Sequence, residues 1–293
     1  MKTETIDSTY ADLDLMDTPD LVRAFMTDQL GAVQAALAAS NQVAQAIDAV
    51  VPRLQAGGRL LYFGAGTSGR LALLDSVELG PTFSWPRERA IASLAGGAGA
   101  VYVAVEGAED SAQLAIQDVQ SLHPTANDVV ISVAASGRTP YAIAVLQEAR
   151  RLGALTLALV NNPESVMIAL ADHAIVIDTG AEVIAGSTRL KAGTAQKIIL
   201  NTLSSGIMVK LAKVYGNLMV DVRATNEKLV QRAIGLTARV AEVDLAAAEA
   251  MLIASEFEVK TAIVALRCGL DIAGARARLN QRKGSVRLAL TPP

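Results

Sequence analysis

Three glycine- and hydroxyl-rich segments of the sequence could bind a phosphate group. They are Gly64–Arg70 (GAGTSGR), Ala134–Thr139 (AASGRT) and Ala185–Arg189 (AGSTR), and each leads into a stretch of helical pattern. A turn that opens a helix directs unpaired backbone N–H groups and the positive end of the helix dipole at a bound anion, and glycine lets the anion come close. Phosphate binding is therefore the first chemistry to consider.

The first of these segments also fits two other interpretations. Gly64, Gly66 and Gly69 satisfy the dinucleotide pattern G-x-G-x-x-G. That pattern predicts an acidic residue at the end of the next strand, whereas Ser93–Gly96 (SLAG) contains none. The plainer alternative is that the glycines only make a tight strand-to-helix turn, which suits one segment better than three with similar chemistry.

Three glutamates could supply acid–base chemistry. Glu78 lies near the predicted end of its helix, where free carbonyls favour a protonated carboxyl, as a general acid requires. Glu106 and Glu109 are three residues apart, so in a helix they would share a face, and either could act as a general base or bind a hydroxyl. The alternative for Glu78 is that it is an ordinary solvated surface residue. The alternative for Glu106 and Glu109 is that they only stabilise the start of the following helix.

The composition favours an α/β protein with a small-molecule ligand. Of 293 residues, 52% are hydrophobic but only 3% aromatic, so the core must consist of Ala, Val, Leu and Ile, which suits helices packed on a buried parallel sheet. The net charge of −3 without a long basic run argues against a nucleic-acid or membrane-surface partner. A single cysteine with His123 and His173 makes no familiar zinc site, so we expect no metal.

Targeting and membrane signals are also weak. The N-terminal residues are acidic and lack the basic start and apolar run of a signal peptide. No apolar run approaches the roughly 18 residues of a membrane span. We therefore expect a cytoplasmic protein.

Five short apolar runs alternate with helical patterns, which predicts an open, doubly wound, mostly parallel sheet flanked by helices. The strands are expected at 59–63, 90–94, 128–134, 154–160 and 173–177, with helices at 21–51, 68–79, 110–122, 140–151 and 190–215. Asp110, followed three residues later by Gln113, resembles a capping box. Ligands of such sheets bind beyond the carboxyl ends of the strands, where all three segments lie.

The C-terminal part contains helical patterns at 226–240, 245–254, 259–266 and 272–279 and no strand signal after residue 241. We predict a main phosphate-binding domain over 1–240, including the N-terminal helices, and a small helical domain over 241–293.

Several long motifs resemble the N-acetylmuramic acid 6-phosphate etherases, a family with the sugar isomerase (SIS) fold. They are FGAGTSGRLALLDSVE, AVEGAEDS, DVVISVAASGRTPYAI and the run from EVIAGSTRLKAGTAQ to ATNEKL, and the resemblance extends over about residues 59–229 and more loosely through the helical C-terminus. The resemblance implies a cytoplasmic homodimer without a cofactor and with its active site near the subunit interface. The implied reaction cleaves the D-lactyl ether of N-acetylmuramate 6-phosphate to N-acetylglucosamine 6-phosphate and D-lactate.

The resemblance also implies roles for individual residues. Glu78 would be the acid/base that serves the ether oxygen, and Glu109 the second catalytic acid/base. The residues implied to bind the substrate or its phosphate are Gly66, Thr67, Ser68, Glu106, Ser136, Gly137, Arg138, Thr139, Ser187 and Lys191. The chain departs from the family pattern at Leu79-Gly80, where a Cys-Pro-Pro-like sequence is usual, and it lacks the family's Arg-Asn near the start.

Two other activities are compatible with the same fold. One is a non-catalytic phosphosugar sensor, similar to the glucokinase regulatory proteins, although the presence of both Glu78 and Glu109 argues against it. The other is an aldose–ketose phosphosugar isomerase, whose product would be an isomer rather than lactate.

Overall fold

The computed structural model describes residues 2–222 and 227–291, which form two compact units. Unit 1 consists of Met1–Val77 and Arg87–Ser204, and unit 2 of Glu78–Pro86 and Ser205–Pro293. Among the described residues, no helix is both long enough and apolar enough to cross a membrane.

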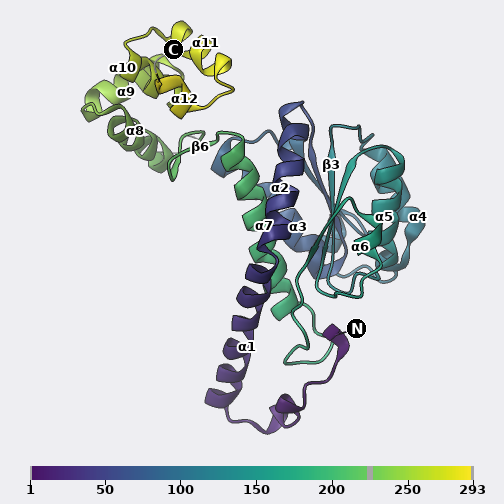
Figure 1. Ribbon diagram of the computed structural model, residues 1–293. Helices are drawn as coiled ribbons and strands as arrows, with labels where there is room; N and C mark the ends of the chain where they lie inside the picture. Colours follow the sequence, from purple (N-terminus) through teal and green to yellow (C-terminus); the bar gives the residue numbers. More distant parts are fainter. Residues whose placement is uncertain (1, 223–226, 292–293) are drawn as a thin grey trace. The chain divides into compact units, whose positions relative to one another are not determined.

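A five-stranded parallel sheet forms the centre of unit 1 (Figure 1). The strands lie in the order β2-β1-β3-β4-β5. β1, β3 and β4 are buried along their whole length, because helices cover both faces and leave no solvent side. The strands are β1 (Leu60–Gly64), β2 (Ala90–Leu94), β3 (Val129–Ala134), β4 (Leu155–Val160) and β5 (His173–Val176).

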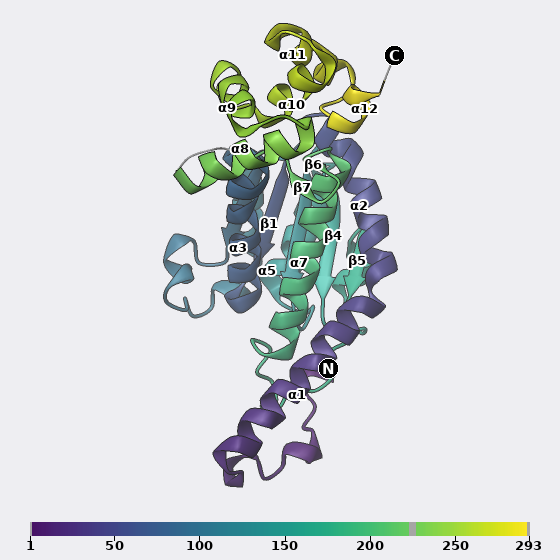
Figure 2. The same ribbon diagram turned by 90° about the vertical axis from the view of Figure 1, so that its left-hand side faces the viewer.

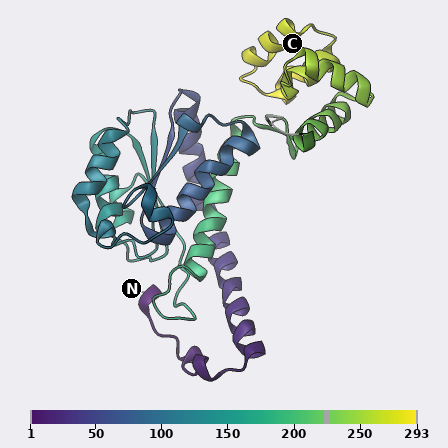
Figure 3. The same cartoon turned by 180° about the vertical axis from the view of Figure 1, so that it is seen from behind.

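Helices cover both faces of this sheet, which confirms the predicted doubly wound α/β fold. Figure 1 shows α4 and α5 on one face and α2, α3 and α7 on the other, and Figure 3 shows the same layers from behind. Leu61 and Phe63 of β1, for example, pack in one cluster with Val119 of α4 and Tyr141 of α5. The helices of unit 1 are α1 (Thr18–Ala38), α2 (Ser40–Gln55), α3 (Gly66–Phe83, which ends in unit 2), α4 (Ala112–Ser121), α5 (Pro140–Arg151), α6 (Met167–Leu170) and α7 (Lys191–Lys210, which also ends in unit 2).

Short 3-10 helices lie in the connections of unit 1. They are η1 (Lys2–Glu4), η2 (Ser8–Tyr10), η3 (Leu13–Leu15), η4 (Arg87–Arg89), η5 (Ala98–Val101) and η6 (Ala108–Asp110).

The predicted end of α3 is wrong. The sequence predicted a stop at Leu79, before the glycine and proline, but the helix continues through Pro81 to Phe83. A proline removes only its own N–H, so a helix can pass through one near its end, and α2 likewise runs past Pro52. α3 stops where Ser84 adopts a left-handed conformation, with φ at +51°.

Two further boundaries differ from the prediction. Ser111 rather than Asp110 caps α4, because its hydroxyl accepts a hydrogen bond from Leu114 N at 3.1 Å. α7 ends at Lys210 instead of continuing to Tyr215, and a hairpin follows it. The hairpin strands are β6 (Val214–Tyr215) and β7 (Leu218–Met219).

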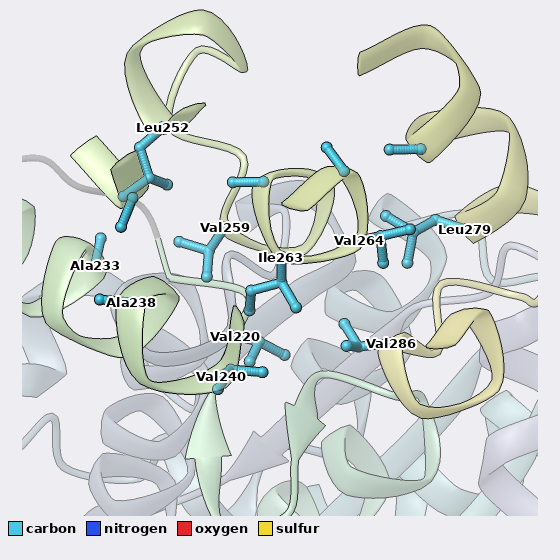
Figure 4. Close-up of a cluster of buried hydrophobic side chains, with 14 of the residues drawn as sticks. Val220, Ala233, Ala238, Val240, Leu252, Val259, Ile263, Val264, Leu279 and Val286 are labelled. Carbon is cyan, nitrogen blue, oxygen red and sulfur yellow. The ribbon is translucent and has the colours of Figure 1, made fainter. Parts of the chain in front are cut away.

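Unit 2 is a helical bundle with its own apolar core (Figure 4). α10 contributes Val259, Ile263 and Val264 to this core, and α8 contributes Ala233 and Ile234. The helices are α8 (Glu227–Ala241), α9 (Leu245–Ala254), α10 (Val259–Cys268), α11 (Ile272–Gln281) and α12 (Val286–Leu290). The short α12 is absent from the sequence prediction, and the predicted domain boundary at residue 240 stays a prediction.

Candidate active site

The strand order places the first two predicted phosphate segments beside each other. The chain leaves β1 through α3 on one face of the sheet and leaves β3 through α5 on the other, and β1 and β3 are neighbours. In a doubly wound sheet, this reversal opens a crevice at the carboxyl ends of the two strands. Residues 65–69 follow β1 and residues 135–139 follow β3, so both segments border that crevice.

The first segment is a tight turn that leads directly into α3. Gly64 and Gly69 must be glycines, because a Cβ added at Gly64 would lie 2.9 Å from the Gly69 Cα. Gly66 begins the helix with φ at +53°, and Thr67 and Ser68 lie in its first turn. The first-turn N–H groups of a helix have no intrahelical partner, so they can bind an anion.

The second segment is held by a contact that local sequence could not reveal. Ser165 donates a hydrogen bond from Oγ to the Gly137 carbonyl at 3.0 Å, and a Cβ on Gly137 would lie 1.9 Å from that Oγ. Arg138 N donates to Ser136 Oγ at 3.2 Å. Thr139 is the N-cap residue of α5 but makes no side-chain capping hydrogen bond, so this helix start is also open to an anion.

The third segment differs, because a carboxylate already occupies the start of α7. Glu182 accepts hydrogen bonds from Lys191 N and Ala192 N, both at 2.9 Å. Burial raises the pKa of Glu182, although the hydrogen bonds from the two amides oppose that shift. The Lys191 ammonium pairs with Asp28 of α1 at 2.6 Å, in a largely buried position. Phosphate binding by Lys191 or the neighbouring Ser187 stays a prediction.

Glu106 and Glu109 line one cavity of about 390 Å³ together with Gly66 of the first segment. No helix spans both residues, because Gly107 adopts φ +73° and η6 begins only at Ala108, so the condition for a shared helical face is not met. Both residues are exposed to solvent, and the loop rather than a helix brings them to the same cavity.

Arg70 holds the loop that carries these glutamates. Its Nε donates to the Val101 carbonyl at 3.0 Å and its Nη2 to the Ala100 carbonyl at 2.8 Å. The sequence offers no signal for this role, because an arginine beside a phosphate turn suggests anion binding instead. Arg70 therefore positions the acidic loop against the first turn of α3.

Glu78 is an exposed residue of α3, within the segment that belongs to unit 2. The helix continues for more than one turn beyond it, so the predicted placement at a helix end is wrong. Its catalytic role is a prediction that rests on the motif.

No group of three or more His, Cys, Asp or Glu side chains in residues 2–222 and 227–291 is arranged to hold a metal ion.

Comparison with known proteins identifies the fold and the family. Residues 42–150 match the glucokinase regulatory protein N-terminal SIS domain, and residues 106–205 match the SIS domain. A phosphoheptose isomerase from Francisella tularensis superposes with a TM-score of 0.50 at 21% identity, over 66% of this chain and 100% of that one. This likeness supports the SIS fold alone.

Two relatives resemble the chain over nearly its whole length. The N-acetylmuramic acid 6-phosphate etherase of Deinococcus radiodurans is 52% identical over 289 residues, which is 99% of this chain and 95% of the relative. The N-acetylmuramic acid 6-phosphate etherase 1 of Enterococcus faecalis is 45% identical, over 98% of this chain and 95% of that protein. With this identity along both chains, the protein belongs to the N-acetylmuramic acid 6-phosphate etherase family.

Proposed function

We propose that this protein is a carbon–oxygen lyase that cleaves the D-lactyl ether of N-acetylmuramic acid 6-phosphate to N-acetylglucosamine 6-phosphate and D-lactate. One structural observation supports the proposal in addition to family membership. Glu106 and Glu109 share a cavity with Gly66, which opens the helix expected to bind the phosphate. Acid–base groups and an anion-binding turn therefore border one space, as a reaction on a sugar phosphate requires.

The assigned residues would divide the work between binding and proton transfer. Ser68, Ser136 and Thr139, with the open helix starts of α3 and α5, would hold the 6-phosphate. Glu109 and Glu78 would act as the two acid/base groups, with Glu78 serving the ether oxygen.

The chemistry explains why two such groups are needed. A carboxylate removes the proton beside the open-chain aldehyde, a double bond forms, and the C–O bond to lactate breaks as a carboxylic acid protonates the departing oxygen. Water then adds to the double bond with the two roles reversed, which produces N-acetylglucosamine 6-phosphate. These steps need no change in oxidation state overall.

Incubation with N-acetylmuramic acid 6-phosphate in ¹⁸O-water tests the proposal. We expect D-lactate release, with the ¹⁸O in the new sugar hydroxyl and none in the lactate. A folded protein that releases no lactate would rule the activity out. Label in the lactate would contradict the elimination route.

A homodimer is supported by an apolar stripe on α1 that lies exposed in the described part of the chain. Val22, Met26, Leu30, Val33 and Leu37 repeat at helical spacing, and each is between 47% and 73% exposed. Figure 2 shows the length of α1 along which this stripe runs. Such a stripe on a helix suits the same stripe of a second copy, because a twofold interface is self-complementary.

Sedimentation of matched variants tests this surface. Leu30→Glu should shift the protein from dimer to monomer at micromolar concentration, because a carboxylate would enter an apolar interface. Ile253→Glu, on an equally exposed residue of α9, should remain dimeric (Leu30 is 62% exposed and Ile253 61%). A monomeric wild-type protein would contradict the dimer.

We also place the protein in the cytoplasm, because a charged sugar phosphate does not cross a membrane unaided and its enzyme must meet it where it is made. Cell fractionation tests this, and recovery outside the cytoplasmic fraction would exclude it.

A further inference from the structure

Among the residues that line the cavity, the two glutamates are accompanied by one cation, Arg70. The charged lining residues are Glu106, Glu109 and Arg70. The Arg70 guanidinium already donates to two backbone carbonyls of the same loop, and none of the described residues bonds to either glutamate carboxylate. A phosphate or a carboxylate placed beside Glu106 and Glu109, rather than at the first turn of α3 by Gly66, would therefore face two like charges.

Most of the other residues that line the cavity are small and apolar. Val105 packs against Gly96. A Cβ added to Gly96 would lie 2.8 Å from the Val105 Cβ, so the absence of a side chain at Gly96 lets the valine pack closely. The wall thus presents methyl groups to a ligand. The apolar lining residues are Ala65, Ala95, Ala100, Ala104, Val105 and Ala108.

We propose that this cavity binds the acetamido group of the sugar, with its methyl on the alanine and valine wall and its N–H donated to the Glu106 carboxylate. The inference rests on the proposed function. Of the substituents on that substrate, the phosphate and the lactyl group are anionic and the hydroxyls carry no methyl. The acetamido group alone is neutral, carries a methyl, and offers a donor to a carboxylate.

Lactate release from N-acetyl and N-butanoyl forms of the substrate tests this assignment. Val105→Ala widens the cavity, so the ratio of kcat/KM for N-butanoyl over N-acetyl should rise about 10-fold. Ala104→Leu narrows it from an exposed position, so kcat/KM for the N-acetyl form should fall about 10-fold, mainly through KM. Val103→Leu changes an exposed residue of the same loop that does not line the cavity, and both substrates should then react as in the wild type.

Equal effects of Val105→Ala on the two acyl forms would overturn the assignment, even if Ala104→Leu failed to fold. A wild type that releases lactate from neither form would instead reject the proposed function. Calorimetry then tests the cavity alone: N-acetylglucosamine 6-phosphate should bind about 10-fold more tightly than glucose 6-phosphate, and Val105→Ala should reduce that preference. Equal binding of the two sugars would also overturn the assignment.

Discussion

At the scale of single residues, the main prediction concerns the carboxyl groups of Glu78 and Glu109. Replacing either with glutamine should lower kcat for lactate release about 1,000-fold, because general acid–base catalysis typically contributes 10²- to 10⁴-fold. N-acetylglucosamine 6-phosphate should still bind, since the amide keeps the shape of the side chain. Glu249→Gln, an exposed residue of α9, is the matched control. A non-catalytic sensor would show no turnover in the wild type.

A second prediction at the scale of single residues concerns the contribution of Gly137 to stability. Gly137→Ala should destabilise the protein by about 2 kcal/mol, because φ is +64° and the new Cβ would meet the Ser165 side chain. Urea unfolding measures this loss. Adding Ser165→Gly should recover part of it by removing the clash, and a double variant no more stable than the single one would contradict this explanation.

At the scale of elements, Asp128 ties the start of β1 to the start of β3. Its carboxylate accepts hydrogen bonds from Arg59 N, Nε and Nη2 at 2.8 to 3.0 Å, and from Thr125 N at 2.8 Å. Burial alone would raise the pKa of Asp128, but the hydrogen bonds from Arg59 and Thr125 bring it below its ordinary value of 3.8. The pair lies at the amino end of the strands, away from the candidate site.

Asp128→Asn should therefore cost stability rather than catalysis. We expect a loss of about 3 kcal/mol at pH 7, because the Arg59 charge would remain without its partner. Since the folded-state pKa is lowered, the contribution of the carboxylate is present above pH 3.8 and disappears as the pH falls through the folded-state value. The difference in unfolding free energy between wild type and variant should shrink in that range, and a pH-independent difference would be inconsistent with this account.

At the scale of the whole molecule, the residues that form the core of unit 2 predict which fragments of the chain can fold alone. The sequence-predicted domain 241–293 lacks Ala233 and Ile234 of α8 and Val220 before it, all of which lie in that core. We expect a fragment of residues 205–293 to melt cooperatively by circular dichroism and the fragment 241–293 not to do so, because the shorter one leaves α10 partly uncovered. Cooperative melting of the shorter fragment would support the boundary at 240.

The sequence alone determined the five strands of the parallel sheet, the α/β fold and the two turns after β1 and β3. These features depend on neighbouring residues: continuous apolar runs mark buried strands, and glycines with hydroxyls mark helix starts. Helix ends were less predictable. Around Pro81 and Ser84, for example, the helix could end at any of several residues, so the local sequence does not select one end.

Only the tertiary structure decided which groups surround the candidate site. Glu182 reaches the start of α7 nine residues further along the chain, and Ser165 packs on Gly137 from another loop. Arg70 holds the loop of Glu106 and Glu109 by binding carbonyls about 30 residues away. These contacts arise from chain packing rather than from local spacing, so no pattern in the sequence could reveal that two turns stay open while Glu182 closes the third.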